Sequence, residues 1–169
     1  MEKLISGQNL HNKNKAQIKN VMIRYLHSAY YCRIYVLEYI EQTKSKIQNE
    51  KLLKIAENVH LILTEHLNTL DQLYTKFKVQ PDNTYTAGIR SYVQEAMIVF
   101  LMESKTQYEK ELVMLSYLDI ISSINDTQIR ILERMAQSLN IADGEFKMFL
   151  SNCKVIAHDL EKLTGSYLD

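Results

Sequence analysis

The stretch LLKIAENVHLILTEHLNTLDQLYTKF, residues 52–77, decides the fold of this chain. Its apolar positions recur at alternating steps of four and three, which places them on one seam of a helix. The seam consists of Leu52, Ala56, Val59, Leu63, His66, Leu70, Leu73 and Phe77. A helix of this length spans roughly 40 Å, and it needs partner helices to cover its apolar side. The pattern therefore predicts a bundle of long helices, with this one at residues 49–79.

The composition also indicates an all-α protein. A chain of 169 residues with 46% hydrophobic content is typical of one folded domain. One proline and four glycines are too few turn-forming residues for a sheet of many strands. We therefore expect an all-α fold, a ferritin-like left-handed four-helix bundle with one short extra helix in the crossover.

The other elements follow in order along the chain. Residues 1–12 show no periodicity and are expected to form a flexible arm, so that residues 13–169 form a single bundle domain. Helices are predicted at residues 12–46, 87–103 and 107–140, and from residue 144 onward. The only proline, Pro81, interrupts the long connection before the short helix, and Asp143 is placed to cap the last helix.

Charge and hydropathy favour a cytoplasmic protein that binds neither nucleic acid nor membrane. Residues 1–54 hold ten Lys and Arg against four acids, but these cations recur mainly on the polar side of a helix. No run of about 18 apolar residues occurs, and because residues 1–20 are mostly polar we expect no signal sequence. Cys32 and Cys153 lie in apolar seams without metal-ligand spacing and are expected to be buried free thiols.

Three polar residues, His66, Asn125 and Gln128, occupy positions in otherwise apolar seams. The simplest interpretation is a buried hydrogen-bonded layer that fixes how the helices align. If the second and fourth long segments run parallel, His66 and Asn125 lie at similar depth and could hydrogen-bond. The alternative is a remnant pocket for a small polar ligand or a single metal.

A di-metal centre would need carboxylates and imidazoles that converge from four helices. Glu57 and His60 have the required Glu-x-x-His spacing, yet they flank the seam, and with His66 they are only weak candidates for metal ligands. The motifs G-x-S-x-G, P-loop, dinucleotide fingerprint and H-E-x-x-H are absent. We therefore expect no cofactor, with iron or manganese as the alternative, and whether the protein is an enzyme stays open, with a non-catalytic role favoured.

Four tyrosines, Tyr30, Tyr31, Tyr35 and Tyr39, make the second half of the first helix unusually aromatic. They cannot all face one seam, and tyrosine is enriched at protein interfaces because it buries a large ring and keeps its hydroxyl in water. We therefore expect a homodimer whose interface includes these side chains.

The chain resembles the bacterial YciE/YciF-type ferritin-like family, which is associated with stress responses. The resemblance covers nearly the whole chain after the N-terminal arm. Its best segment, residues 60–74, is similar to the family's His-Leu-Glu-Glu-Thr segment and the run that ends near Arg-Leu-Glu. Residues 25–31 and 88–95 resemble the family's early Leu-Tyr-x-Ala-Glu segment and its Met-Glu-Gly-Leu-Ile segment.

The departures from the family pattern concern the metal site. The family's early Glu falls among Tyr31, Cys32 and Arg33, and the acid three residues after its His is replaced by Leu63. The Glu-His-Tyr-Glu segment falls at residues 122–125, so only His60 carries over. The resemblance thus implies a stress-related bundle with a degenerate metal site that acts through dimerisation or protein contacts. The alternative is an atypical metal-binding oxidase or iron-handling protein.

Overall fold

The computed structural model is a bundle of helices. It describes the backbone of residues 2–84, 86–141 and 144–168, and the side chains of residues 14–84, 86–141, 144 and 146–167. The helices are α1 (Glu2–Thr43), α2 (Glu50–Phe77), α3 (Ala87–Ile98), α4 (Gln107–Ser138) and α5 (Gly144–Leu168), with a 3₁₀ turn η1 (Lys44–Lys46) after α1 and a π-helical turn η2 (Val99–Glu103) after α3. No strand occurs among these described residues, and none of these helices has a segment apolar enough to cross a membrane. The expected all-α fold is confirmed.

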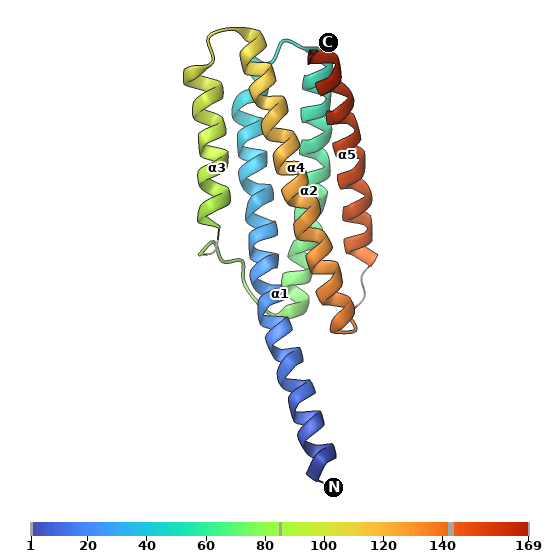
Figure 1. Cartoon of the computed structure of the whole chain (residues 1–169). Coiled ribbons are helices and arrows are strands. Elements are labelled where there is room, and N and C mark those ends of the chain that lie inside the picture. The colour runs from blue at the N-terminus through green and yellow to red at the C-terminus, as the bar shows by residue number, and fades with distance from the viewer. Residues whose placement is uncertain (1, 85, 142–143, 169) are drawn as a thin grey trace.

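The arrangement of the helices also agrees with the expected crossover. Figure 1 shows α1, α2, α4 and α5 as four long helices side by side, with the short α3 on the outside next to α1. The chain runs through α2 and α4 in the same direction and through α1 and α5 in the opposite direction. The long connection that contains α3 returns the chain to the other end of the bundle, which makes α2 and α4 parallel.

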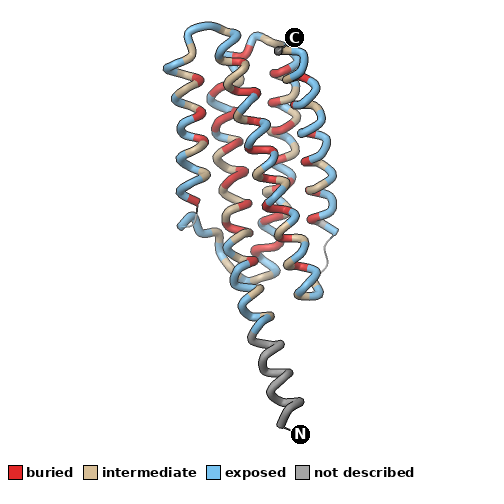
Figure 2. The backbone as a smooth tube through the Cα atoms, in the orientation of Figure 1, coloured by how far each residue is buried: buried red, intermediate tan, exposed pale blue. Residues whose placement is uncertain are grey.

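The predicted seams form the buried sides of the long helices (Figure 2). In α2, every seam residue is buried except Phe77, which is half-buried at the last turn, and Tyr74 is buried in addition. On α4 the buried side follows the same steps of three and four, and it consists of Met114, Leu118, Ile121, Asn125, Gln128, Leu132 and Ala136. On the short helix α3, Val93 and Ala96 are buried, and Tyr92 is half-buried.

Local sequence sets where the helices begin and end. The Asn49 side-chain oxygen accepts the backbone N–H groups of Lys51 and Leu52, both at 3.0 Å, which caps α2. Lys78 adopts a left-handed conformation with φ of 56° and closes the same helix. At α4, Thr106 and Glu109 form a reciprocal capping box.

Two predictions concern the start of α1 and the residue just before α5. α1 begins at Glu2, earlier than the predicted start near residue 12, and ends at Thr43. The side chains of residues 1–13 lie outside the described residues, so the flexible arm predicted at residues 1–12 stays a prediction. Asp143, the predicted cap of α5, also lies outside the described residues.

Glu111 of α4 binds several groups at the end of the bundle that holds the α1–α2 connection. Its carboxylate accepts the backbone N–H groups of Gln48 and Asn49 at 2.9 and 2.8 Å, and the Gln107 side-chain amide at 2.7 Å. The Tyr167 hydroxyl of α5 donates to the other carboxylate oxygen at 2.7 Å. One nearly buried carboxylate therefore joins the α1–α2 connection to α4 and α5.

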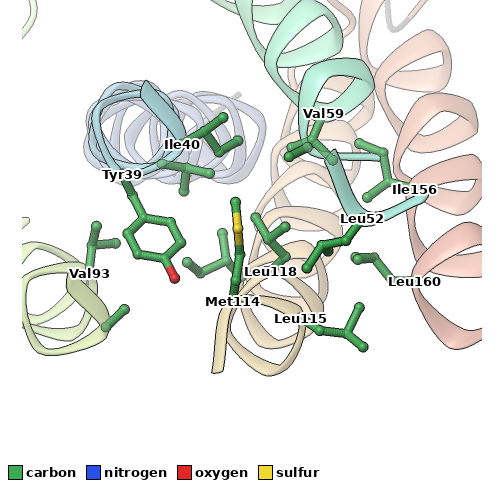
Figure 3. Close-up of a cluster of buried hydrophobic side chains, with 14 of the residues drawn as sticks. Tyr39, Ile40, Leu52, Val59, Val93, Met114, Leu115, Leu118, Ile156 and Leu160 are labelled. Atoms are coloured by element: carbon green, nitrogen blue, oxygen red, sulfur yellow. The ribbon is translucent and has the colours of Figure 1, made fainter. Parts of the chain in front are cut away.

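The apolar core is divided into two clusters along the bundle axis. One lies toward the α1–α2 connection and includes Tyr39, Phe100 and Met114; Figure 3 shows the Tyr39 ring between α1, α3 and α4. The other lies toward the α2–α3 connection and includes Leu70 and Phe146. Buried polar residues of α1, α2 and α4 fall at or beside the boundary between these clusters along the chain, so a polar layer separates them; they are Arg33, His66, Ser122, Asn125 and Gln128.

Candidate functional site

The polar layer is centred on Arg33, whose side chain is 0% exposed. Its Nη1 donates to the Ala29 carbonyl oxygen one turn earlier in α1 at 2.7 Å and to Asn125 Oδ1 of α4 at 3.3 Å. Its Nε donates to His66 Nδ1 of α2 at 3.5 Å. The guanidinium carbon also lies 5.8 Å from the centre of the Phe149 ring of α5. One cationic side chain therefore contacts all four long helices.

The bonds of Arg33 determine the protonation of His66. A guanidinium has donors only, so His66 Nδ1 must accept, and the single proton of the neutral ring must sit on Nε2. Asn152 Nδ2 of α5 lies 3.3 Å from this Nε2, and because Nε2 carries the ring proton, the amide must flip so that its oxygen accepts that proton. Burial and the positive charge of Arg33 lower the pKa of His66 to about 3. His66 is therefore a neutral link between α1 and α5.

The three polar residues predicted from the seams are all buried. His66 and Asn125 lie at the same level, as expected from the parallel course of α2 and α4, but each of them bonds to Arg33 and no bond joins them directly. Gln128 bonds to the Ser28 hydroxyl of α1 at 2.9 Å. The sequence did not predict Arg33 or Asn152 as members of the layer. The helical pattern places Arg33 only at the edge of the apolar seam of α1, and Asn152 is half-buried on α5.

No carboxylate hydrogen-bonds to Arg33 among the described residues. The ionisable groups that influence its pKa are the thiols of Cys32 and Cys153, while burial lowers that pKa. Burial in turn raises the pKa of the Cys32 thiol to about 11. Both cysteines are free and buried, as expected from the sequence. The charge of the guanidinium is thus offset by neutral acceptors and a ring face rather than by an anion.

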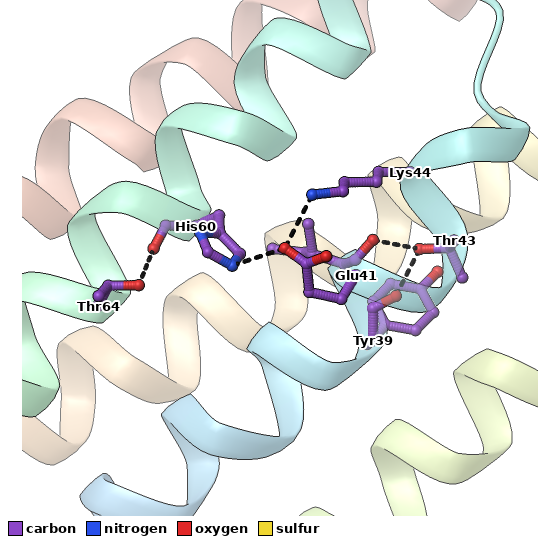
Figure 4. Close-up of polar contacts among 7 residues, drawn as sticks. Tyr39, Glu41, Thr43, Lys44, His60 and Thr64 are labelled. Carbon is purple, nitrogen blue, oxygen red and sulfur yellow. Dashed lines mark hydrogen bonds and ion pairs between the residues drawn. The ribbon is translucent and has the colours of Figure 1, made fainter.

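The weak metal candidates do not come together. Glu57 is exposed on α2, whereas His66 lies in the core. His60 Nε2 lies 2.9 Å from Glu41 Oε1 of α1, and Lys44 contacts the same oxygen at 2.8 Å (Figure 4). In the part of the chain that the structure describes, no three His, Cys, Asp or Glu side chains are grouped so that they could hold a metal ion.

Iron or manganese does not fit the donors of the polar layer. These ions prefer several carboxylate or imidazole ligands, whereas the layer offers one imidazole and neutral amides around a guanidinium. A cavity of about 10 Å³ lies beside it, lined by Ser122, Asn125 and Cys153 together with apolar side chains. That volume holds at most about one water molecule. The cavity is thus small, and the alternative of a remnant pocket for a small polar ligand or a single metal stays a prediction.

The tyrosines predicted at an interface have contacts within the chain. Tyr39 is 0% exposed in the core, so its inclusion in an outer interface was wrong. Tyr30 packs edge-on against Tyr74 of α2, and the Tyr35 hydroxyl lies 3.2 Å from Thr86 Oγ1 at the start of α3. The Tyr31 ring packs against the rings of Tyr30 and Tyr35. The half-buried rings stay a predicted interface, smaller than expected because α3 covers part of this side.

Comparisons with known proteins support the fold. No family model matches the chain, and no curated protein does. Among solved structures, the stress protein YciF of E. coli matches with a TM-score of 0.80 and 14% identity, over 89% of this chain and 96% of that one. YcfI, a candidate structural protein from Rhodopseudomonas palustris, matches with a TM-score of 0.78 and 14% identity, over 85% and 92% of the two chains. At this identity the likeness concerns the fold, and on that level the resemblance seen in the sequence is confirmed: the chain has the YciF-type helical-bundle fold.

Proposed function

We propose that this protein is a non-catalytic, stress-related helical bundle that acts through contacts with a second copy of itself or with other proteins. The observation that supports this proposal is Arg33, a permanently charged cation that lies where the four long helices meet. The fold neighbours are called a stress protein and a structural protein, which agrees with such a role. We further propose that it works in the cytoplasm without nucleic acid.

A buried guanidinium disfavours metal chemistry in this layer for electrostatic reasons. Two like charges a few ångströms apart repel strongly wherever water is excluded. A divalent ion also needs negative ligands to offset the loss of its hydration shell, and the layer has none among the described residues. The same groups serve a structural purpose, because each bond of Arg33 links α1 to another helix or to its own preceding turn.

The metal content of the purified protein tests this proposal. Protein prepared without added metal should contain far less than one iron or manganese ion per chain by elemental analysis. Addition of Fe(II) in air should give no faster formation of ferric absorbance than buffer alone. One or more tightly held ions per chain, or rapid Fe(II) oxidation, would contradict a non-catalytic bundle.

Light scattering tests the proposed self-association. We expect a mass of twice the 19.8 kDa chain at micromolar concentrations. Tyr31→Ser should shift the equilibrium toward monomer, because this half-buried ring leaves part of its apolar surface exposed. Met102→Ser is the matched control, since Met102 is 81% exposed on a different part of the surface. A monomeric wild-type protein would refute self-association, and equal effects of the two variants would refute the tyrosine interface.

A further inference from the structure

His27 of α1 holds the connection between α2 and α3 through a single nitrogen atom. The side chain is 6% exposed, and its ring stacks on Tyr74 with centres 5.4 Å apart. The Nδ1 atom lies 2.8 Å from the Tyr74 hydroxyl oxygen of α2 and 3.2 Å from the backbone nitrogen of Asp82. The residue directly after the only proline of the chain is thus attached to α1 by an imidazole.

The chemistry of these partners requires a neutral ring with an unprotonated Nδ1. A backbone N–H can only donate, so Nδ1 must accept from Asp82, and the single ring proton sits on Nε2. A second proton would bind to Nδ1 and turn this acceptor into a donor. The Tyr74 hydroxyl can rotate and accept instead, but the Asp82 N–H cannot. Protonation of His27 therefore breaks the bond to the connection and leaves two N–H groups facing each other.

We propose that His27 is a proton-operated latch: the neutral ring holds the α2–α3 connection against α1, and the charged ring releases the connection at Asp82. The release is local, because the Tyr35 hydroxyl still reaches Thr86 at the far end of the connection. Val79, on the near side of Asp82, packs against the apolar cluster that contains Leu70. Opening at Asp82 therefore uncovers the apolar surface under Val79.

Two effects of the surroundings shift the pKa of His27 in opposite directions. Burial disfavours the charged ring and lowers the pKa of His27, while the carboxylate of Asp82 raises it, and burial has the larger effect. Asp82 directs this carboxylate mainly to its own turn, where it accepts the Thr84 backbone N–H at 2.9 Å. The titratable groups around the His27–Tyr74 pair are Tyr30 and Tyr31 of α1, Asp71 of α2 and Asp82 of the connection.

The direction of the pKa shift gives the direction of the pH response. The folded pKa of His27 lies below the usual value of 6.5, so the unfolded chain binds the proton more readily. The stability that the neutral ring contributes is complete above this value. It is lost as the pH falls from 6.5 through the folded pKa, and the latch opens in the same range.

Amide hydrogen exchange followed by NMR tests the latch directly. In the full-length protein, the protection factor of the Asp82 amide should be high at about pH 7.5 and should fall by up to about tenfold per pH unit as the pH drops from the usual histidine pKa toward the folded pKa of His27, as expected for one proton. The ring signals of His27 should titrate over the same range. Amides in the middle of α4, such as that of Leu118, should keep their protection, which separates local release from global unfolding.

Substitutions of His27 separate its charge from its role as an acceptor. His27→Asn places an oxygen near the position of Nδ1 that does not titrate, so the Asp82 amide should stay protected at both ends of the pH range. His27→Phe removes the acceptor, so that amide should exchange freely throughout. His158→Gln, which changes an exposed histidine of α5, should behave as wild type. Asp82 protection that stays constant over the pH range in which the His27 ring signals titrate would overturn the proposal. A wild-type pH response in His27→Asn would overturn it as well.

Discussion

Replacement of Asn125 by leucine should destabilise the protein by about 1.5–3 kcal/mol, and most of this loss should disappear in a chain that also carries Arg33→Met. Asn125 Oδ1 accepts a bond from a fully buried guanidinium. Its removal leaves a charged N–H group without a partner in the core, which is costly. When methionine replaces Arg33, no charged donor remains, and the leucine introduced at position 125 meets an apolar neighbour.

Four proteins measure this coupling by urea denaturation: wild type, both single variants and the double variant. The double-mutant cycle should give an interaction energy of about 1 kcal/mol or more between positions 33 and 125. Thr164→Val, on α5 far along the chain from the layer, provides the matched control and should combine additively with Asn125→Leu. Additivity at positions 33 and 125 would mean that the two side chains do not interact.

The second large effect is expected at Glu111, where Glu111→Leu should cost roughly 3 kcal/mol of unfolding free energy and Glu111→Gln roughly 1 kcal/mol. Leucine deprives two backbone N–H groups and two side-chain donors of their acceptor. Glutamine keeps one oxygen for three of these donors and loses mainly the negative charge. Urea denaturation near neutral pH measures both losses, and an equal cost for the two variants would contradict the geometry.

The pH dependence of stability gives an independent test of Glu111. Burial acts to raise the pKa of this carboxyl, but the hydrogen bonds from Gln107, Tyr167, Asn49 and Gln48 outweigh it, so the pKa is lowered below its usual value of 4.5. The contribution of the carboxylate is therefore complete above 4.5 and is lost as the pH falls through the folded pKa. The stability difference between wild type and Glu111→Gln should shrink below this value. A constant difference would show that the charge is not responsible.

The periodic part of the sequence was enough to predict the long helices and their buried sides. In α2 the steps of four and three define one stripe, and nothing in residues 52–77 competes with it, so the helix and seven of its eight predicted inward residues agree with the structure. The polar positions of that seam and of the α4 seam were found for the same reason. A residue type that departs from a regular pattern is easy to recognise.

Arg33 could not be assigned in this way. A helical pattern gives the face on which a residue lies, but a long side chain can carry its charge out to water or into the core. The direction depends on which groups the neighbouring helices offer, here Asn125 and His66, and that depends on their relative height. The environment of the tyrosines was missed for a related reason, since the sequence did not show which side of the bundle α3 covers.

The burial of the two free thiols has a consequence for the rates of chemical labelling. A thiol reacts as the thiolate, and the Cys32 and Cys153 side chains are 0% and 3% exposed, with pKa values raised by burial. A thiol reagent can therefore modify them only while the surrounding helices are transiently open. The chain thus carries two natural kinetic reporters, one on α1 and one on α5. Their labelling times would show whether the first and last helices separate from the bundle together or one after the other.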